Sequence, residues 1–248
     1  MSVIIWKNIS NKMIGGVSMI LTVTKRLLGE NNKDYAYRII KEGIMSLELK
    51  PGQAISEIEL AETLNLSRTP IREVLAKLRE ENLIIVIPQV GTYITKIELQ
   101  LVKEASFMRF YLEQEILKQS CESFPLENLL ELRKNVELQK ALIGSKGMER
   151  DFHKLDNNFH LTIFQGNKME NVWAAITRLS THYNRIRLLS EMKYNFEKTI
   201  SEHETIMDII ENKESERVEE IVRKHILEPM PLWESLFQEG SPYLNYFN

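Results

Sequence analysis

The stretch that most constrains the fold of this chain runs over residues 57–95, EIELAETLNLSRTPIREVLAKLREENLIIVIPQVGTYIT. It contains two short segments whose apolar residues recur at helical spacing, separated by an interruption at Asn65 and Leu66. Ser67 or Thr69 can cap the second segment, and Pro70 falls in its first turn, where a missing N–H group breaks no hydrogen bond. The apolar stripe of the second segment comprises Ile71, Val74, Leu75 and Leu78. The pattern predicts two short helices joined by a tight turn.

A β-hairpin is predicted directly after these two helices. Residues 83–87 form a β-branched run, residues 88–91 have turn chemistry, and residues 92–97 alternate again. Upstream, residues 35–47 have the spacing of a further amphipathic helix, which a Pro-Gly pair ends. This order of elements predicts a winged helix-turn-helix, which binds duplex DNA. The alternative, a small helical core with a hairpin that takes no part in binding, explains the order less well.

Residues 35–97 also carry a family resemblance. The string LKPGQAISEIELAETLNLSRTPIREVLAKLREENLI, followed by PQVGTYI, resembles the DNA-binding domain of the GntR family of bacterial transcription regulators. The resemblance implies that Arg68 and Arg72 meet phosphates or base edges in the major groove. It also implies that Thr69 contacts the DNA backbone and that Gly91 lets the wing approach the minor groove. The complete set of expected DNA-binding residues is Ser67, Arg68, Thr69, Arg72, Lys77, Gln89 and Gly91.

Two positions depart from the family pattern. Val90 stands where a basic residue commonly precedes the wing glycine, and Ile58 stands where one branch of the family carries an arginine. Both departures affect the expected base preference and leave the prediction of DNA binding unchanged.

The composition fits a sequence-specific DNA-binding protein of the cytoplasm. With 43% hydrophobic and 27% charged residues among 248, the chain has an ordinary soluble composition. Its formal net charge of −3 argues against indiscriminate coating of nucleic acid, whereas a specific binder can concentrate basic groups on one face. Cys121 is the only cysteine, which excludes an internal disulfide framework and fits a reducing compartment.

The start of the chain fits neither the DNA-binding pattern nor the later helices. Its apolar run over residues 13–24 is too short to span a bilayer, and no small-residue cleavage site of a signal peptide follows it. We expect a loosely packed extension over residues 1–30, with Met19 as an alternative start of translation. The winged helix-turn-helix domain is expected over residues 31–97.

After the hairpin, glycine and proline become rare and helical spacing continues to about Phe237. Helices are expected over residues 100–122, 125–143, 146–165, 169–192, 195–212 and 215–228. Asn195 and Ser215 can cap the last two. Six helices with short loops predict an all-helical antiparallel bundle, so the fold class is mainly α. The helical effector-binding domain is expected over residues 98–237 and a tail over residues 238–248.

Histidines in this half have the spacing of a metal site. Asp156 and His160 are four residues apart and therefore share one helical face, which His153 also shares. His203 and His225 lie on two later predicted helices. Imidazole suits zinc, nickel or copper, and a carboxylate widens the choice toward manganese or iron. Spacing alone favours the alternative, in which these are surface or hydrogen-bonded histidines and an ordinary intrahelical pair, because the convergence of three helices cannot be read from a sequence.

Four landmarks in this half are similar to the FCD ligand-binding domain, the all-helical partner of GntR winged helices in the FadR-like branch. They are Asp156-x-x-x-His160, Gly166-Asn167, Glu202-His203-x-x-Ile206 and Lys224-His225-Ile226. In metal-binding members the equivalent residues hold the ion. The resemblance therefore implies that a divalent ion is held by Asp156, His160, His203 and His225, with His153 as a spare candidate. Zinc is the first choice of ion, and nickel and manganese are alternatives. The acyl-CoA-binding member of this branch lacks the histidine set, which argues against a fatty acyl-CoA as the effector here. The expected count of six helices resembles the VanR-like subgroup.

The usual effectors of the family are small organic acids. A carboxylate can complete the shell of a buried cation while an arginine binds it in a bidentate manner. Arg109 occupies a position where the domain commonly has an arginine that faces the cavity, and Arg185 and Arg187 are further candidates. For each arginine, the alternative is a solvated charge or an intrahelical ion pair.

These features together predict a metabolite-responsive transcription regulator, a repressor that binds a palindromic operator as a homodimer. Two alternatives remain open at this point. The first is a metal-dependent bundle enzyme, although no histidine of the candidate site has the glutamate three residues earlier that di-iron bundles use. The second is a regulator whose metal is purely structural and which has no effector.

Overall fold

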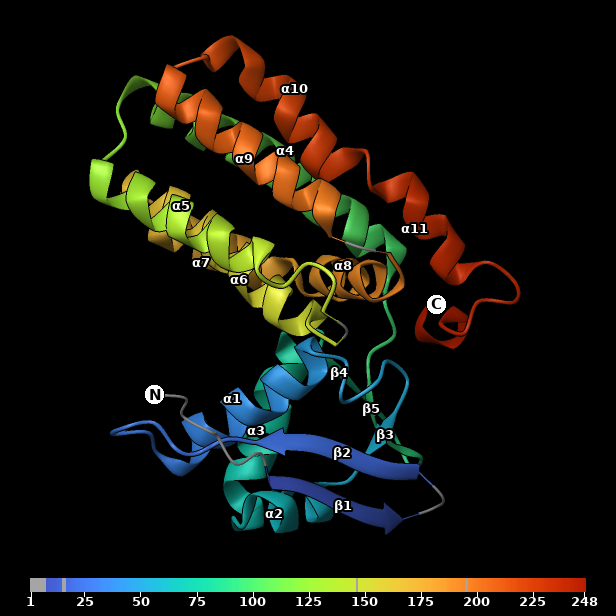
Figure 1. Cartoon of the computed structure of the whole chain (residues 1–248). Helices are drawn as coiled ribbons and strands as arrows, with labels where there is room; N and C mark the ends of the chain where they lie inside the picture. The colour runs from blue at the N-terminus through green and yellow to red at the C-terminus, as the bar shows by residue number, and fades with distance from the viewer. Residues whose placement is uncertain (1–7, 15–16, 146, 195) are drawn as a thin grey trace. The chain divides into compact units, whose positions relative to one another are not determined.

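The computed structural model describes residues 8–14, 17–145, 147–194 and 196–248. The chain divides into two compact units (Figure 1). The first unit comprises the amino-terminal part up to Ile97 together with Asn245–Asn248, and the second comprises Glu98–Leu244. Among the described residues, no helix is long and apolar enough to cross a membrane.

The first unit contains a winged helix-turn-helix, as expected. Its elements are β1 (Asn8–Ile14), β2 (Val17–Val23), α1 (Asn32–Met45), β3 (Ala54–Ile55), α2 (Glu57–Leu64), α3 (Arg68–Glu80), β4 (Ile84–Ile87) and β5 (Gly91–Ile94). The wing is a three-stranded antiparallel sheet in the order β3-β5-β4, with Ile84 opposite Ile94. The apolar stripes of α1, α2 and α3 meet in one core.

Capping explains where these helices begin and end. The Asn31 side chain accepts hydrogen bonds from the first-turn amides of α1, and Ser56 caps α2. The α2 helix ends at Asn65, which takes a left-handed conformation with φ of 51°. Ser67 occupies the cap position of α3, but its side chain makes no capping hydrogen bond, contrary to expectation. Its hydroxyl is therefore not engaged by the helix that it precedes.

The amino-terminal extension differs from the loose segment that we expected. Its strands β1 and β2 pair in antiparallel fashion, and Leu21 is fully buried in the core of the first unit. A Cβ atom on Gly43 of α1 would lie 2.4 Å from Cδ1 of Leu21, so the absent side chain makes room for this contact. The backbone amide and hydroxyl of Thr22 both donate to the carboxylate of Glu48. The prediction of a loosely packed extension over residues 1–30 is therefore wrong for β2. Residues 1–7 lie outside the described part.

The second unit is a helical bundle (Figure 1). Its main helices are α4 (Leu99–Glu122), α5 (Leu126–Lys140), α6 (Glu149–Gly166), α7 (Glu170–Leu179), α8 (Thr181–Lys193), α9 (Glu197–Asn212), α10 (Val218–Val222) and α11 (Met230–Phe237). Short 3₁₀ segments lie at Ser215–Arg217 and Leu244–Tyr246, and a π-helical turn, η2, at Arg223–Leu227. Helix α4 packs against α6, α7, α8, α9 and α10.

One predicted helix is two helices. The segment expected over residues 169–192 is broken at Ser180, whose φ of −96° and ψ of 22° depart from helical values. The count of six helices, and with it the reason for favouring the VanR-like subgroup, is therefore wrong. The expected cap Asn195 lies outside the described residues.

The carboxy-terminal tail is partly an element of the first unit. Phe247 is buried, and the amide of Ile97 donates to the carbonyl of Tyr246 at 2.7 Å. The amide of Asn248 in turn donates to the carbonyl of Ile97. Before the tail, Trp233 of α11 packs edge-on against Tyr183 of α8 with ring centroids 5.5 Å apart. Helix α11 therefore belongs to the bundle, whereas the last four residues do not.

Candidate metal centre and DNA-binding surface

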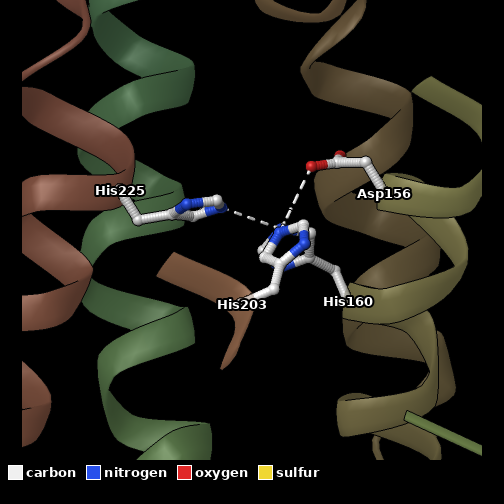
Figure 2. A group of neighbouring side chains, drawn as sticks. All are labelled: Asp156, His160, His203 and His225. Carbon is white, nitrogen blue, oxygen red and sulfur yellow. Dashed lines mark hydrogen bonds and ion pairs between the residues drawn. The ribbon is translucent and has the colours of Figure 1, made fainter. Parts of the chain in front are cut away.

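Four side chains from three separate segments meet inside the bundle. Asp156 and His160 come from α6, His203 from α9 and His225 from η2 (Figure 2). Their potential ligand atoms all lie within 4.8 Å of one another, and all four residues are buried. Because α6 and α9 are long regular helices, their ligands have fixed directions. His225 lies in a wider π-helical turn, a feature often found at functional sites.

The contacts within this group join nitrogen and oxygen atoms that can all bind a metal. Nε2 of His160 lies 3.1 Å from Nε2 of His225. Oδ1 of Asp156 lies 3.5 Å from Nε2 of His203 and 3.9 Å from Nε2 of His160. Among the described residues, Oδ2 of Asp156 and Nε2 of His203 are buried without a hydrogen-bond partner. Unsatisfied buried polar atoms need an explanation, and a bound cation is one.

Each imidazole is oriented by an acceptor on its other nitrogen. Nδ1 of His160 lies 2.8 Å from Glu113, and Nδ1 of His225 lies 2.9 Å from Glu202. Nδ1 of His203 lies 2.8 Å from the side-chain oxygen of Gln139. We infer that all three Nδ1 atoms carry the proton, which leaves the three Nε2 lone pairs directed at one another. Metal-binding histidines have this arrangement, in which an outer acceptor fixes the tautomer.

Burial keeps these imidazoles neutral. It lowers the pKa of His203 to about 4, and it also lowers the pKa values of His160 and His225 below the ordinary histidine value. Burial alone would raise the pKa of Asp156, but the positive charge of Arg187, 2.6 Å away, lowers that pKa together with contacts to His203 and His160, and the net result is a pKa well below the ordinary value. Three neutral imidazoles and one carboxylate are the protonation states that a divalent metal requires.

Aromatic rings fix the planes of two of these histidines. Phe159 stacks on His203 with ring centroids 4.1 Å apart, and Trp173 stacks on His160 at 5.6 Å. The residues therefore fit a tetrahedral or a more open site for a divalent ion, with three nitrogen donors and one oxygen donor.

The predicted DNA-binding residues lie at two places in the first unit. Ser67, Arg68, Thr69 and Arg72 are exposed at the start of α3, and Arg68 and Arg72 both pair with Glu57. Gln89 lies in the β4–β5 turn and Gly91 begins β5, and both have positive φ. The two departures from the family pattern, Ile58 and Val90, are also exposed. Lys77 is exposed later in α3, and its amino group lies 3.7 Å from the centre of the Tyr37 ring of α1.

Comparison with known proteins agrees with both halves of this geometry. Residues 32–94 match the family described as bacterial regulatory proteins, gntR family, and residues 104–228 match the FCD domain. This chain is a gntR-family transcription regulator with an FCD domain. Its function is regulation of transcription, which removes the enzyme alternative.

Several relatives align with nearly their whole length to this gntR-family chain. HTH-type transcriptional repressor RspR of Escherichia coli is 29% identical over 84% of this chain and 92% of its own length. HTH-type transcriptional regulator LutR of Bacillus subtilis is 24% identical over 82% of this chain and 99% of its own. The solved structure of E. coli McbR/YncC covers 84% of this chain and 100% of its own, with 19% identity and a TM-score of 0.72, which shows the shared fold.

Two of the three predicted effector arginines lie beside the candidate metal group of the FCD domain. Arg109 is buried with its Nε 2.6 Å from Glu113, the residue that orients His160. Arg187 donates to Asp156, and both guanidinium groups face the ring of Tyr183, at 4.8 and 5.8 Å. Among the described residues, Nη2 of Arg109 and Nη1 of Arg187 are buried without a hydrogen-bond partner.

The remaining predicted residues lie outside the four-residue group. Arg185 is buried but hydrogen-bonds to the carbonyl of Thr181 and to His182, and burial lowers its pKa to about 9. His153, the spare ligand, instead pairs with Glu191 at 3.1 Å. His153 is therefore an outer neighbour, because Glu191 also lies 3.6 Å from Arg187.

Sequence reasoning missed the acceptors that orient the histidines. Glu113 follows Arg109 by four residues, a helical spacing that would have paired them, but nothing local indicated His160 as its second partner. Nothing in the sequence around Gln139 indicated that it would contact a histidine. Glu202 is next to His203 in the sequence, and the structure pairs it with His225.

A small cavity adjoins the group on the side of His160 and His225. Its volume is about 10 Å³, close to the smallest space that can hold one water molecule. Apart from these histidines and Glu113, its walls are apolar: Leu117, Ile163, Phe164, Ile206, Val222 and Ile226. The described bundle therefore offers room for a water-sized ligand next to the histidines and apolar walls around it.

Proposed function

We propose that this regulator binds a divalent metal through Asp156, His160, His203 and His225, and that a small organic acid bound beside the metal changes its affinity for DNA. The observation that carries the proposal is the convergence of three Nε2 lone pairs on one carboxylate in a buried site. Zinc fits this donor set best, and nickel or manganese also fits. When bound, the metal supplies a positive charge that attracts an anionic ligand.

The arginines beside the metal group support an anionic effector. Nη2 of Arg109 and Nη1 of Arg187 are buried donors, and a carboxylate is the acceptor that matches a guanidinium group best. Glu113 holds Arg109, and Asp156 holds Arg187, so both guanidinium groups are already oriented. An acid that reached them would touch the same residues that hold the metal. Effector and metal binding are therefore expected to be coupled.

We further propose that the chain binds a palindromic operator as a homodimer, which the winged helix supports. Two copies related by a two-fold axis present two α3 helices to successive major grooves. Ser67, Arg68, Thr69 and Arg72 at the start of α3 are exposed and positioned for phosphates or base edges. The wing turn, with Gln89 and Gly91, would follow the backbone into the minor groove. The role of repressor is supported by the relative RspR, whose name describes it as one.

The metal part of the proposal is tested by measuring metal content in the purified full-length chain. We expect about one divalent ion per chain in the wild type and in His153→Ala, and loss of the ion in His160→Ala and His203→Ala. His153→Ala is the matched control, because His153 lies on the same helix but outside the four-residue group. Equal metal content in all four proteins would contradict the site.

The effector part is tested by DNA binding in the presence of a panel of small carboxylic and hydroxy acids. We expect at least one acid to change the affinity of the wild-type chain for a selected duplex and to have no effect on Arg109→Ala. A chelator that lowers thermal stability, with no acid altering DNA affinity, would show that the metal is purely structural.

A further inference from the structure

The recognition helix begins with two arginines that share one carboxylate. Arg68 is the first residue of α3 and Arg72 follows one turn later, so their side chains project from the same face. Nε of Arg68 lies 2.5 Å from Oε1 of Glu57, and Nε of Arg72 lies 2.8 Å from Oε2. Glu57 is the first residue of α2. One carboxylate therefore joins the starts of both helices of the helix-turn-helix.

This carboxylate is less exposed than the arginines that it binds. The Glu57 side chain is 23% exposed, against 54% for Arg68 and 62% for Arg72. In the part of the chain that the structure describes, the hydrogen bonds of both guanidinium groups run through Nε. The Nη groups of each guanidinium are thus available to donate to other acceptors. The hydrogen bonds from Arg72 and Arg68 also lower the pKa of Glu57, which keeps it charged at neutral pH.

We propose that Glu57 is a positioning residue for DNA recognition, which holds Arg68 and Arg72 in one orientation and thereby favours specific over non-specific DNA. This inference rests on the proposed role of the two arginines in DNA binding. The physical argument has two parts. A free arginine has many rotamers to lose when it contacts a base, whereas one held at Nε has fewer. The negative charge also repels phosphates, which weakens contacts that carry no sequence information.

The test compares the full-length wild-type chain with Glu57→Gln, using two duplexes. One duplex is selected by the wild-type chain from a random pool, and the other is an unselected duplex of the same length. We expect Glu57→Gln to bind the unselected duplex more tightly, with a steeper dependence on salt, because both arginines become free to meet phosphates. The ratio of specific to non-specific affinity should fall about tenfold, the effect of losing part of one bidentate base contact.

The control is Glu73→Gln, which changes the net charge by the same amount on α3. The Glu73 side chain pairs with Lys33 at 3.0 Å instead of with either arginine. If both variants change the ratio equally, the effect is one of net charge and the positioning role is wrong. A role limited to stability would lower the melting temperature and leave the ratio unchanged, which would also overturn the inference. If Glu57→Gln does not fold, the test uses Glu57→Asp instead. Aspartate keeps the negative charge, but its shorter side chain places the carboxylate farther from the two arginines.

The underlying assignment has its own test. The Arg68→Ala, Arg72→Ala double variant should lose binding to the selected duplex. Full retention of binding would refute the role of the arginines themselves, whereas loss in this variant with an unchanged ratio in Glu57→Gln would refute only the role of Glu57.

Discussion

At the scale of single residues, the candidate metal centre depends as much on the outer acceptors as on its four ligands. Glu113, Gln139 and Glu202 each receive an Nδ1–H group, and each therefore directs an Nε2 lone pair inward. Gln139 is itself held by Asn135 at 2.7 Å, which sets the direction of its amide. Without these acceptors the imidazoles could exchange tautomers. The acceptors outside the four-residue group therefore set the direction of the lone pairs that the proposed metal would use.

We expect Glu113→Ala to weaken metal binding by about 10–100-fold without removing any ligand, because His160 loses the acceptor that fixes its tautomer. The measurement is competition for the ion against a chelator of known affinity. Glu115→Ala is the matched control, since Glu115 lies on the same helix but is exposed. Equal metal affinity in Glu113→Ala and the wild type would show that Glu113 does not support the site.

At the scale of elements, contacts distant in sequence determine where helices and strands end. Asn167 donates to the hydroxyl of Ser120 and to the carbonyl of Ile163, and so joins the end of α6 to α4. The break at Ser180 separates α7 from α8, and the second helix carries Tyr183 and Arg187 to the metal group. In the first unit, β2 joins the core through Leu21. None of these arrangements follows from the periodicity of one segment.

The packing of β2 makes a prediction about stability. Leu21→Ala should lower the free energy of unfolding by about 2–5 kcal/mol, because it removes a fully buried side chain from the core of the first unit. The measurement is denaturant unfolding of the full-length chain. Leu28→Ala is the control, since Leu28 is fully exposed and its truncation should have almost no effect. An equally small effect of both substitutions would mean that the extension is loose after all.

At the scale of the whole molecule, the proposed binding of a palindromic operator requires a second copy of the chain. Helix α4 exposes Phe107 and Tyr111, which are 65% and 56% exposed and whose ring centroids lie 4.7 Å apart. We propose this pair of exposed rings as the centre of the surface through which two copies associate. Two α4 helices that ran antiparallel about Tyr111 would bring Glu104 of one subunit opposite Lys118 of the other. The charges on this face of α4 would therefore pair across the two-fold axis.

If the proposed dimer forms through this face of α4, we expect Tyr111→Glu to shift the full-length chain toward monomer, because the new carboxylates would face each other across the two-fold axis. Analytical ultracentrifugation measures the change. Leu130→Glu on α5, where the leucine is 54% exposed, is the control and should leave the dimer intact. A dimer that persists in Tyr111→Glu would place the association surface elsewhere.

The sequence by itself determined the winged helix, the mainly helical second half and the residue types of the metal group. It did so because amphipathic spacing, caps and turn residues act within a few residues of one another, and because the motifs resemble those of a known family. Only the tertiary structure decided that Arg187 and Glu113 meet the metal group, that Arg185 and His153 do not, and that Leu21 and Phe247 are buried. The partners in those contacts lie far apart in the chain, so their meeting depends on how whole helices pack, which local spacing does not record.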